Sequence, residues 1–159
     1  MKHRLKNEHG LSLVELLAVF VILGILSTIA YTVIFSGYKA YDRINVESDL
    51  RDEADIIMAE LISDLYTLKE SEIANTPTSS QPFFELKNGK KIGFDGGKVL
   101  LKAKTTNSLH SGKIKLHDDS KIMEEDEGLF HIYLTLEWDN GDRIQTLTTE
   151  SVVSILKDQ

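Results

Sequence analysis

The apolar residues of the chain are concentrated in one early block. The segment from Leu11 to Phe35 is predominantly apolar and contains a single charged residue, Glu15. At 1.5 Å of rise per residue, a helix of this length spans about 37 Å, more than the roughly 30 Å hydrocarbon core of a bilayer. A secretory signal peptide would have a shorter apolar region of about 7–15 residues and an A-x-A cleavage site. The pattern therefore predicts a transmembrane helix over residues 11–35, and an ordinary signal anchor is its simplest explanation.

A second helical pattern follows directly, and we assign residues 36–75 to an amphipathic stalk helix. Its apolar residues recur at spacings of three and four, which is typical of a helix with one apolar face. They are Leu50, Ala54, Ile57, Leu61, Leu65 and Leu68. No proline precedes Pro77, so the membrane segment and the stalk can form one continuous helix. The second half of the stalk is expected to pack on the head, and the apolar first half against copies or relatives of itself.

After the proline-containing loop at residues 75–82 the pattern alternates with a period of two. Residues 91–95 and 98–104 form a predicted hairpin around the Gly96-Gly97 turn. Residues 130–138 form a half-buried strand, and the turn at 139–142 leads into a returning strand at 143–150, which residues 151–156 extend or follow as an edge. The predicted class is therefore α+β, with a long N-terminal helix packed against a small antiparallel sheet in an extracytoplasmic head at residues 82–159.

The charge of the chain argues against a surface that grips nucleic acid throughout. Eighteen Lys and Arg residues oppose 25 Asp and Glu residues, for a net charge of −7. Charge is unevenly placed, because residues 87–115 are rich in lysine and residues 47–72 are rich in acids. Solvated or mutually complementary faces are the simpler reading. The alternative is a patch for DNA or another anionic polymer on one strand, formed by Lys98, Lys102 and Lys104.

No catalytic residue, metal site or cofactor is predicted. The chain has no cysteine, which excludes disulfides and thiolate chemistry. The acids between Asp118 and Glu127 offer oxygen ligands for calcium, but they lack EF-hand spacing and fit a solvated acidic loop better. The five histidines are scattered, and His131 is expected to be a surface residue on a strand. Neither a nucleophile elbow nor a phosphate-binding loop is present, so the chain is not expected to be an enzyme.

Glu15 is the residue that a simple anchor does not explain. A carboxylate inside a membrane helix costs about 2.5–3.5 kcal/mol on insertion scales and is a functional candidate by default. No Lys, Arg or His lies between Leu11 and Gly37, so a cationic partner must come from another chain or from a new terminus. Cleavage after Gly10 would create an α-amino group on Leu11 at the edge of the membrane helix.

The segment Gly10-Leu11-Ser12-Leu13-Val14-Glu15-Leu16-Leu17, preceded by the basic leader at residues 1–10, resembles the class III leader junction of type IV prepilins and type II secretion pseudopilins. The resemblance covers residues 1–40. It implies cleavage by a prepilin peptidase between Gly10 and Leu11, N-methylation of Leu11, and pairing of Glu15 with the new N-terminus of an adjacent subunit. The chain departs from the family in two places: Leu11 stands where Phe is commonest, and Thr32 stands where many pilins carry a helix-breaking Pro.

The resemblance also implies a biological setting. Before assembly the chain would be a single-pass protein of the lipid bilayer, with a cytoplasmic N-terminus and an extracytoplasmic head. An assembly platform and its ATPase would then insert it among other pilin or pseudopilin subunits at the cell surface. The missing cysteines and the short leader suit a minor pilin of a Gram-positive competence-type DNA-uptake system or a related secretion system, with DNA at most an indirect partner. The alternative is a membrane-anchored binding or sensor module with an uncleaved anchor.

Overall fold

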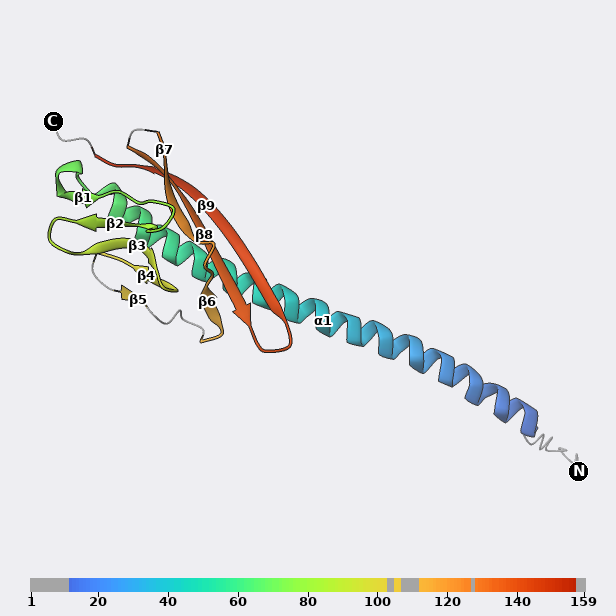
Figure 1. The fold of residues 1–159 in the computed structure, drawn as a ribbon. Helices are drawn as coiled ribbons and strands as arrows, with labels where there is room; N and C mark the ends of the chain where they lie inside the picture. The colour runs from blue at the N-terminus through green and yellow to red at the C-terminus, as the bar shows by residue number, and fades with distance from the viewer. Residues whose placement is uncertain (1–11, 103–104, 107–111, 127, 157–159) are drawn as a thin grey trace, which may run out of the picture. The chain divides into compact units, whose positions relative to one another are not determined.

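The computed structural model of the chain describes residues 12–102, 105–106, 112–126 and 128–156, and the chain divides into the units Met1–Arg43 and Ile44–Gln159, which are described separately. The helix α1 runs from Leu13 to Tyr66 and contributes to both units (Figure 1). A short 3-10 helix, η1, follows at Glu70–Glu72. The strands are β1 (Ile73–Asn75), β2 (Phe83–Leu86), β3 (Lys91–Asp95), β4 (Lys98–Leu100), β5 (Thr105–Thr106), β6 (Ile114–Leu116), β7 (Lys121–Asp126), β8 (Leu129–Asp139) and β9 (Ile144–Ser154).

The predicted continuity of the membrane and stalk segments is confirmed, but the predicted helix end at residue 75 is wrong. The α-helix ends at Tyr66, where the Thr67 hydroxyl donates to the carbonyls of Ser63 and Asp64 at 3.2 and 3.1 Å. The next residues leave the helix because their backbone is used elsewhere. Leu68 and Glu70 bond to the backbone of Leu156, and Ile73–Asn75 pairs with β2. Pairing with strands that lie far away in sequence therefore overrides the helical pattern in this stretch.

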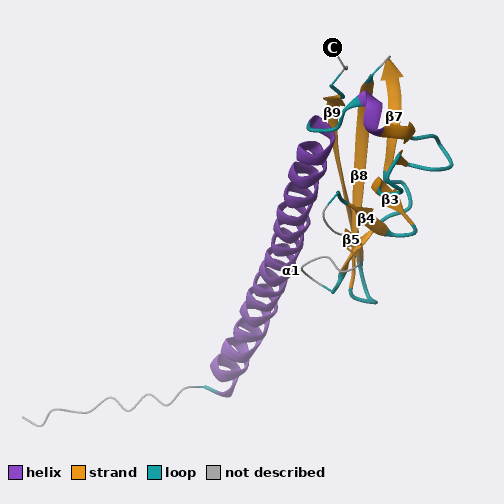
Figure 2. Ribbon diagram, turned by 90° about the vertical axis from the view of Figure 1, so that its left-hand side faces the viewer, coloured by secondary structure: helices purple, strands orange, loops and turns teal. Residues whose placement is uncertain are grey.

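The strands of the second unit form two antiparallel sheets. The first sheet has the order β1-β2-β3-β4-β5. In the second sheet β8 pairs with β6 and β7 on one side and with β9 along its whole length on the other. The strands all gather along the second half of α1 (Figure 2). This arrangement confirms the predicted α+β class with a helix packed against antiparallel strands.

The core of the second unit lies between α1 and the two sheets. The predicted helical stripe faces it, since Leu61, Leu65 and Leu68 are fully buried. The inward residues of β8 are also buried: Phe130, Ile132, Leu134 and Leu136. Phe84 of β2 meets Phe130 of β8 edge to face, with 4.7 Å between ring centroids. This contact joins the two sheets in one apolar core.

The strand predictions hold in part. The hairpin at Gly96-Gly97 is confirmed, because Asp95 pairs with Lys98 and both glycines have positive φ, which a two-residue turn of this kind requires. Its second strand is shorter than predicted and ends at Leu100. The long strand β8, the turn and the single returning strand β9 are confirmed. The prediction of a solvated acidic loop is wrong for residues 121–126, because these residues form β7. Ile122 of this strand is fully buried and anchors it to the core.

Candidate functional site

The first half of α1 exposes its apolar side chains around its whole circumference. Within the unit Met1–Arg43 every described residue is exposed, with Leu13 79% and Phe20 65% accessible. The helix is long and apolar enough to cross a membrane, and no part of its most apolar stretch is buried in the molecule. Such a surface requires lipid or other apolar helices around it. One long apolar helix close to the N-terminus thus fits a single-pass membrane anchor.

The hydroxyls of two threonines in this helix donate hydrogen bonds to backbone carbonyls of the same helix. Thr28 donates to the carbonyl of Gly24 and Thr32 to the carbonyl of Thr28, both at 2.9 Å. Neither hydroxyl therefore needs a partner from outside the helix, which lowers the cost of placing it in an apolar environment. At Thr32, where many pilins would carry a proline, the helix continues without interruption.

Glu15 takes part in a reciprocal cap at the start of α1. Its carboxylate Oε2 accepts a hydrogen bond from the backbone N–H of Ser12 at 2.9 Å. The hydroxyl oxygen of Ser12 accepts one in return from the backbone N–H of Glu15 at 3.2 Å. This is a capping box, which satisfies two backbone donors that the first helical turn leaves free. The carboxylate also lies at the positive end of the helix dipole, so part of its charge is stabilised within its own chain.

The Ser12 cap makes a prediction of its own. Ser12→Ala is expected to cost about 1 kcal/mol of local helix stability, because the N–H of Glu15 loses its acceptor. Amide hydrogen exchange of the full chain in detergent micelles should show about fivefold faster exchange at Glu15, with no change in the second unit. Ser12→Thr is the matched control, since it retains a capping hydroxyl. Equal exchange rates for wild type and Ser12→Ala would contradict a stabilising cap.

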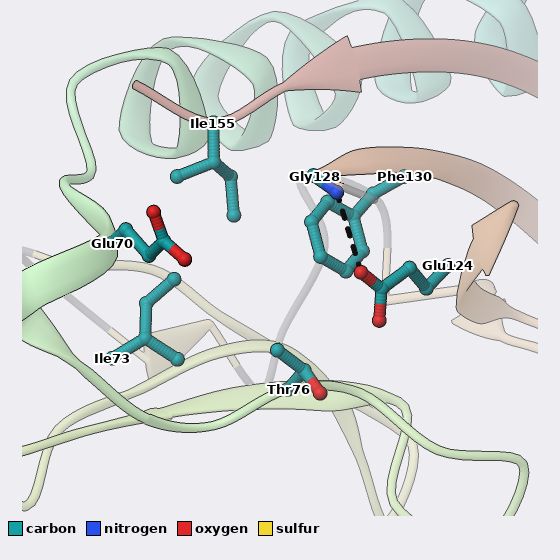
Figure 3. A pocket seen from close by; sticks show the side chains of 7 residues that line it. All are labelled: Glu70, Ile73, Thr76, Glu124, Gly128, Phe130 and Ile155. Atoms are coloured by element: carbon teal, nitrogen blue, oxygen red, sulfur yellow. Dashed lines mark hydrogen bonds between the residues drawn. The ribbon is translucent and has the colours of Figure 1, made fainter. Parts of the chain in front are cut away.

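In the second unit, a small cavity of about 80 Å³ has apolar walls and two carboxylates. Figure 3 shows Phe130, Ile73 and Ile155 along the cavity, with Glu70 and Glu124 on different sides of it. Glu124 is already engaged, as it accepts a hydrogen bond from the N–H of Gly128 at 3.3 Å. Thr76 also lines the cavity, and this set of side chains by itself defines no reaction.

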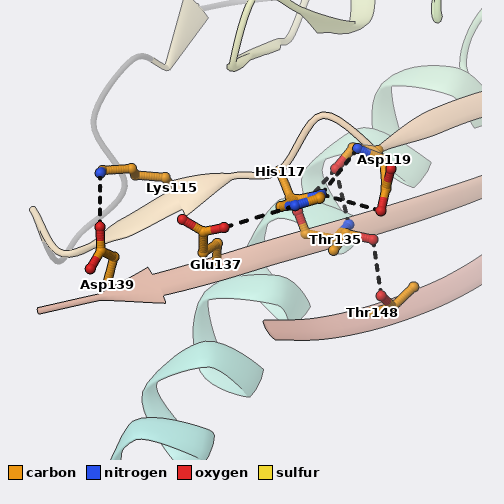
Figure 4. A network of polar contacts seen from close by, with 8 residues as sticks. Lys115, His117, Asp119, Thr135, Glu137, Asp139 and Thr148 are labelled. Atoms are coloured by element: carbon orange, nitrogen blue, oxygen red, sulfur yellow. Dashed lines mark hydrogen bonds and ion pairs between the residues drawn. The ribbon is translucent and has the colours of Figure 1, made fainter. Parts of the chain in front are cut away.

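The outer face of the second sheet carries two histidines between carboxylates. The ring of His117 lies 3.3 Å from Asp119 and 3.8 Å from Glu137 (Figure 4). His131 is half-buried rather than a simple surface residue, and its two ring nitrogens lie 3.4 Å from Glu125 and 3.9 Å from Glu150. In each case different ring nitrogens face the two acids, so the two acids and the ring do not converge on one point as the ligands of a shared metal would. Among the described residues no group of three ligands could hold a metal ion.

The three lysines of the candidate anionic-polymer patch do not share a described strand. Lys98 is exposed in β4, whereas Lys102 lies beyond the end of that strand. The backbone N–H of Lys102 donates to Asp64 of α1 at 2.6 Å, which ties this segment to the helix. Lys104 lies outside the described residues. The patch stays a prediction.

Gly10 and Leu11, the predicted cleavage and methylation residues, also lie outside the described residues. The described part of the site is thus Ser12, Glu15 and the apolar helix that follows. Sequence reasoning identified Glu15 but missed Ser12. The signal was present, because Ser12-Leu13-Val14-Glu15 is a capping-box sequence directly before an apolar run.

A known family model matches this N-terminal region of the chain. Residues 5–31 fit the model of the prokaryotic N-terminal methylation motif. The match supports a class III prepilin-type leader and a subunit of the type IV pilin or pseudopilin type. It points to a structural protein rather than an enzyme, and such a motif implies processing by prepilin peptidase and assembly with other pilin subunits. Neither the curated proteins nor the solved structures contain a significant match to the chain.

Proposed function

We propose that the chain is a minor structural subunit of a type IV pilus-like or pseudopilus filament. The observation that carries the proposal is the junction itself: an acid at the start of a long helix whose first, apolar part, up to Arg43, has only exposed residues, within a segment that fits the methylation motif. A minor role is supported by the head, whose described loops are short and carry no large insertion.

Cleavage of the leader would convert the chain from a membrane-anchored form into a form that can be assembled. The leader carries Lys2, Arg4 and Lys6, and moving several cations across lipid is costly, so an uncut chain stays in the membrane with its N-terminus in the cytoplasm. Prepilin peptidase would cut between Gly10 and Leu11 and methylate the Leu11 amine. An assembly platform and its ATPase could then extract the helix into a filament at the cell surface.

Glu15 would set the register of assembly. Its Oε2 is held by the Ser12 N–H, and the cap fixes the side chain at the helix start. The Leu11 ammonium of an adjacent subunit would pair with this carboxylate inside an apolar bundle of helices. An ion pair in such a medium is sensitive to the loss of either partner. Pairing of these two groups would therefore select correctly placed subunits.

Intact-mass measurement of the protein purified from membranes of the producing cells tests the proposal directly. We expect a mass that lacks residues 1–10 and includes one added methyl group. Gly10→Val should leave the leader attached, because the peptidase would no longer recognise the junction. A wild-type protein that retains Met1 would overturn the proposal.

One observation favours a second candidate, a membrane-anchored binding or sensor module. The capping box gives Glu15 a structural role that needs no second chain. This candidate predicts an intact N-terminus and unchanged behaviour in cells without prepilin peptidase. The same mass measurement therefore separates the two.

The machine served by the filament is proposed to be a competence-type DNA-uptake or protein-secretion system of a Gram-positive cell. The absence of cysteine supports this choice, because no disulfide closes a head loop. DNA would contact the machine rather than this chain. Deletion of the gene should reduce transformation in the first case and leave transformation unchanged while reducing secretion in the second.

A further inference from the structure

The aromatic and basic residues of the first part of α1 gather in one short stretch at its end. Residues 31–43 contain four aromatic residues and two cations: Tyr31, Phe35, Tyr38, Tyr41, Lys39 and Arg43. The preceding residues 13–30 contain one aromatic residue, Phe20, and no cation. The helix passes from one stretch to the other without a break (Figure 1). Such a change in composition is typical of a helix that leaves the hydrocarbon core, because tyrosine and cations are favoured at the membrane–water interface.

The length of the apolar stretch agrees with a boundary at this point. From Leu13 to Phe35 the helix rises about 33 Å, close to the roughly 30 Å thickness of the hydrocarbon core. Lys39 and Arg43 lie about 6 and 12 Å beyond Phe35 along the helix axis. The headgroup layer of one leaflet adds about 5–8 Å. Side chains on a helix lean toward its N-terminus, so both cations lean back toward this layer.

Contacts between side chains one turn apart show this lean directly. The rings of Tyr31 and Phe35 stack with 5.8 Å between their centroids and an angle of 9° between their planes. The ammonium nitrogen of Lys39 lies 4.6 Å from the centroid of the Phe35 ring. The lysine side chain therefore runs back along the helix by one turn, and the ring face stabilises its charge. This arrangement places the ammonium group close to the end of the apolar stretch, at the level of lipid phosphates.

Both cations lack a carboxylate partner. Lys39 and Arg43 are exposed, and among the described residues neither takes part in an ion pair. The next cation along the helix, Arg51, is in contrast paired with Glu47 at 2.8 Å. Asp42 is the single acid of residues 31–43, so this segment has a net positive charge. Anionic phosphate groups complement two unpaired cations in this position.

We propose that residues 31–43 lie in the phospholipid headgroup layer where α1 leaves a bilayer, and that Lys39 and Arg43 bind the phosphates of anionic lipids. Tyr38 and Tyr41 are 67% and 63% exposed, so their rings and hydroxyls are available to the same layer. Tyrosine suits this place because its ring is apolar and its hydroxyl is polar. The inference rests on the membrane anchor, which both candidate functions share, and does not require a filament.

Single fluorescent labels test the depth, and the cysteine-free chain makes each label unique. The full-length protein would be placed in vesicles of phosphatidylcholine and phosphatidylglycerol, labelled at Ile29→Cys, Gly37→Cys or Ser48→Cys. Gly37 has no atom within 4 Å of an added Cβ, so the substitution fits.

A nitroxide on the lipid headgroup should quench the label at Gly37→Cys most strongly, and a nitroxide deep in the acyl chain should quench Ile29→Cys most strongly. The label at Ser48→Cys lies about 16 Å beyond Gly37 along the helix and should be quenched by neither. Any other order would overturn the proposed depth. Because the vesicles contain no peptidase or assembly machinery, the result is independent of the proposed filament function.

Association with spin-labelled lipids tests the phosphate contacts. In the same vesicles at low salt, the combined substitutions Lys39→Gln and Arg43→Gln should lower the preference for phosphatidylglycerol over phosphatidylcholine about threefold. Asp42→Asn should raise this preference, because it removes the one negative charge of the segment. The leader cations are the same in every variant, so they cancel from the comparison.

Arg51→Gln is the matched control, since it also removes one positive charge from α1. Arg51 is paired with Glu47 and lies about 12 Å beyond Arg43 along the helix, outside the headgroup layer. We expect Arg51→Gln to leave the lipid preference unchanged. If the combined Lys39 and Arg43 variant behaves like Arg51→Gln, the proposed phosphate contacts are wrong.

Discussion

Glu15→Ala is expected to be cleaved and methylated normally yet to enter filaments about 100-fold less efficiently than the wild type. Removing one partner of a buried ion pair costs about 3–5 kcal/mol, because the remaining Leu11 ammonium would stay charged among apolar helices. Each 1.4 kcal/mol corresponds to a factor of ten in an equilibrium. The measurement is the ratio of mature protein in sheared filaments to mature protein in membranes, in cells that contain the native assembly machinery.

Glu15→Gln is the matched control for the two roles of this side chain. Glutamine at this position can still accept the hydrogen bond from the Ser12 N–H, so it preserves the capping box while removing the charge. We expect Glu15→Gln to assemble nearly as poorly as Glu15→Ala. If Glu15→Gln instead assembles like the wild type, the carboxylate acts as a helix cap and the proposed pairing with the Leu11 amine is wrong.

The anchor and the long helix could be predicted because their signals are local. An apolar run with one acid has few interpretations, and the absence of proline before Pro77 permits one helix. The helix end could not be located in the same way. Leu68 continues the apolar spacing but contributes to the core after the helix has ended, and Leu156, at the opposite end of the chain, takes the backbone that follows.

The sheets show the same division between local and distant signals. The Gly96-Gly97 turn and the alternation in β8 are visible in sequence because each depends on neighbouring residues. The acid-rich strand β7 is not, since its single fully buried residue, Ile122, gains its environment from β8 and the core. The position of β9 at the edge of its sheet could not be predicted from the sequence either, because whether a strand has a second neighbour depends on the order of all strands in the sheet.

Gly93→Ala is expected to lower the free energy of unfolding of the head by about 3 kcal/mol. Gly93 has a φ of +138°, a backbone conformation that residues other than glycine rarely adopt. A Cβ at this position would lie 2.5 Å from the carbonyl oxygen of Pro82 and 2.7 Å from the Cα of Phe83. Both contacts are with backbone, so β2 and β3 would have to separate where they pair. Urea unfolding of the full chain in micelles, followed by the fluorescence of the single tryptophan, Trp138, measures the loss.

Gly89→Ala separates the two causes of this loss. Gly89 also has positive φ, at +81°, but a Cβ there would meet nothing within 4 Å. It should therefore cost only about 1 kcal/mol of backbone strain. Because Trp138 lies in the second sheet and Gly93 in the first, a shift of its unfolding transition by Gly93→Ala also requires that the two sheets unfold together around their shared core. Equal midpoints for the two alanine variants would contradict the steric argument, and an unchanged Trp138 transition would contradict a single cooperative head.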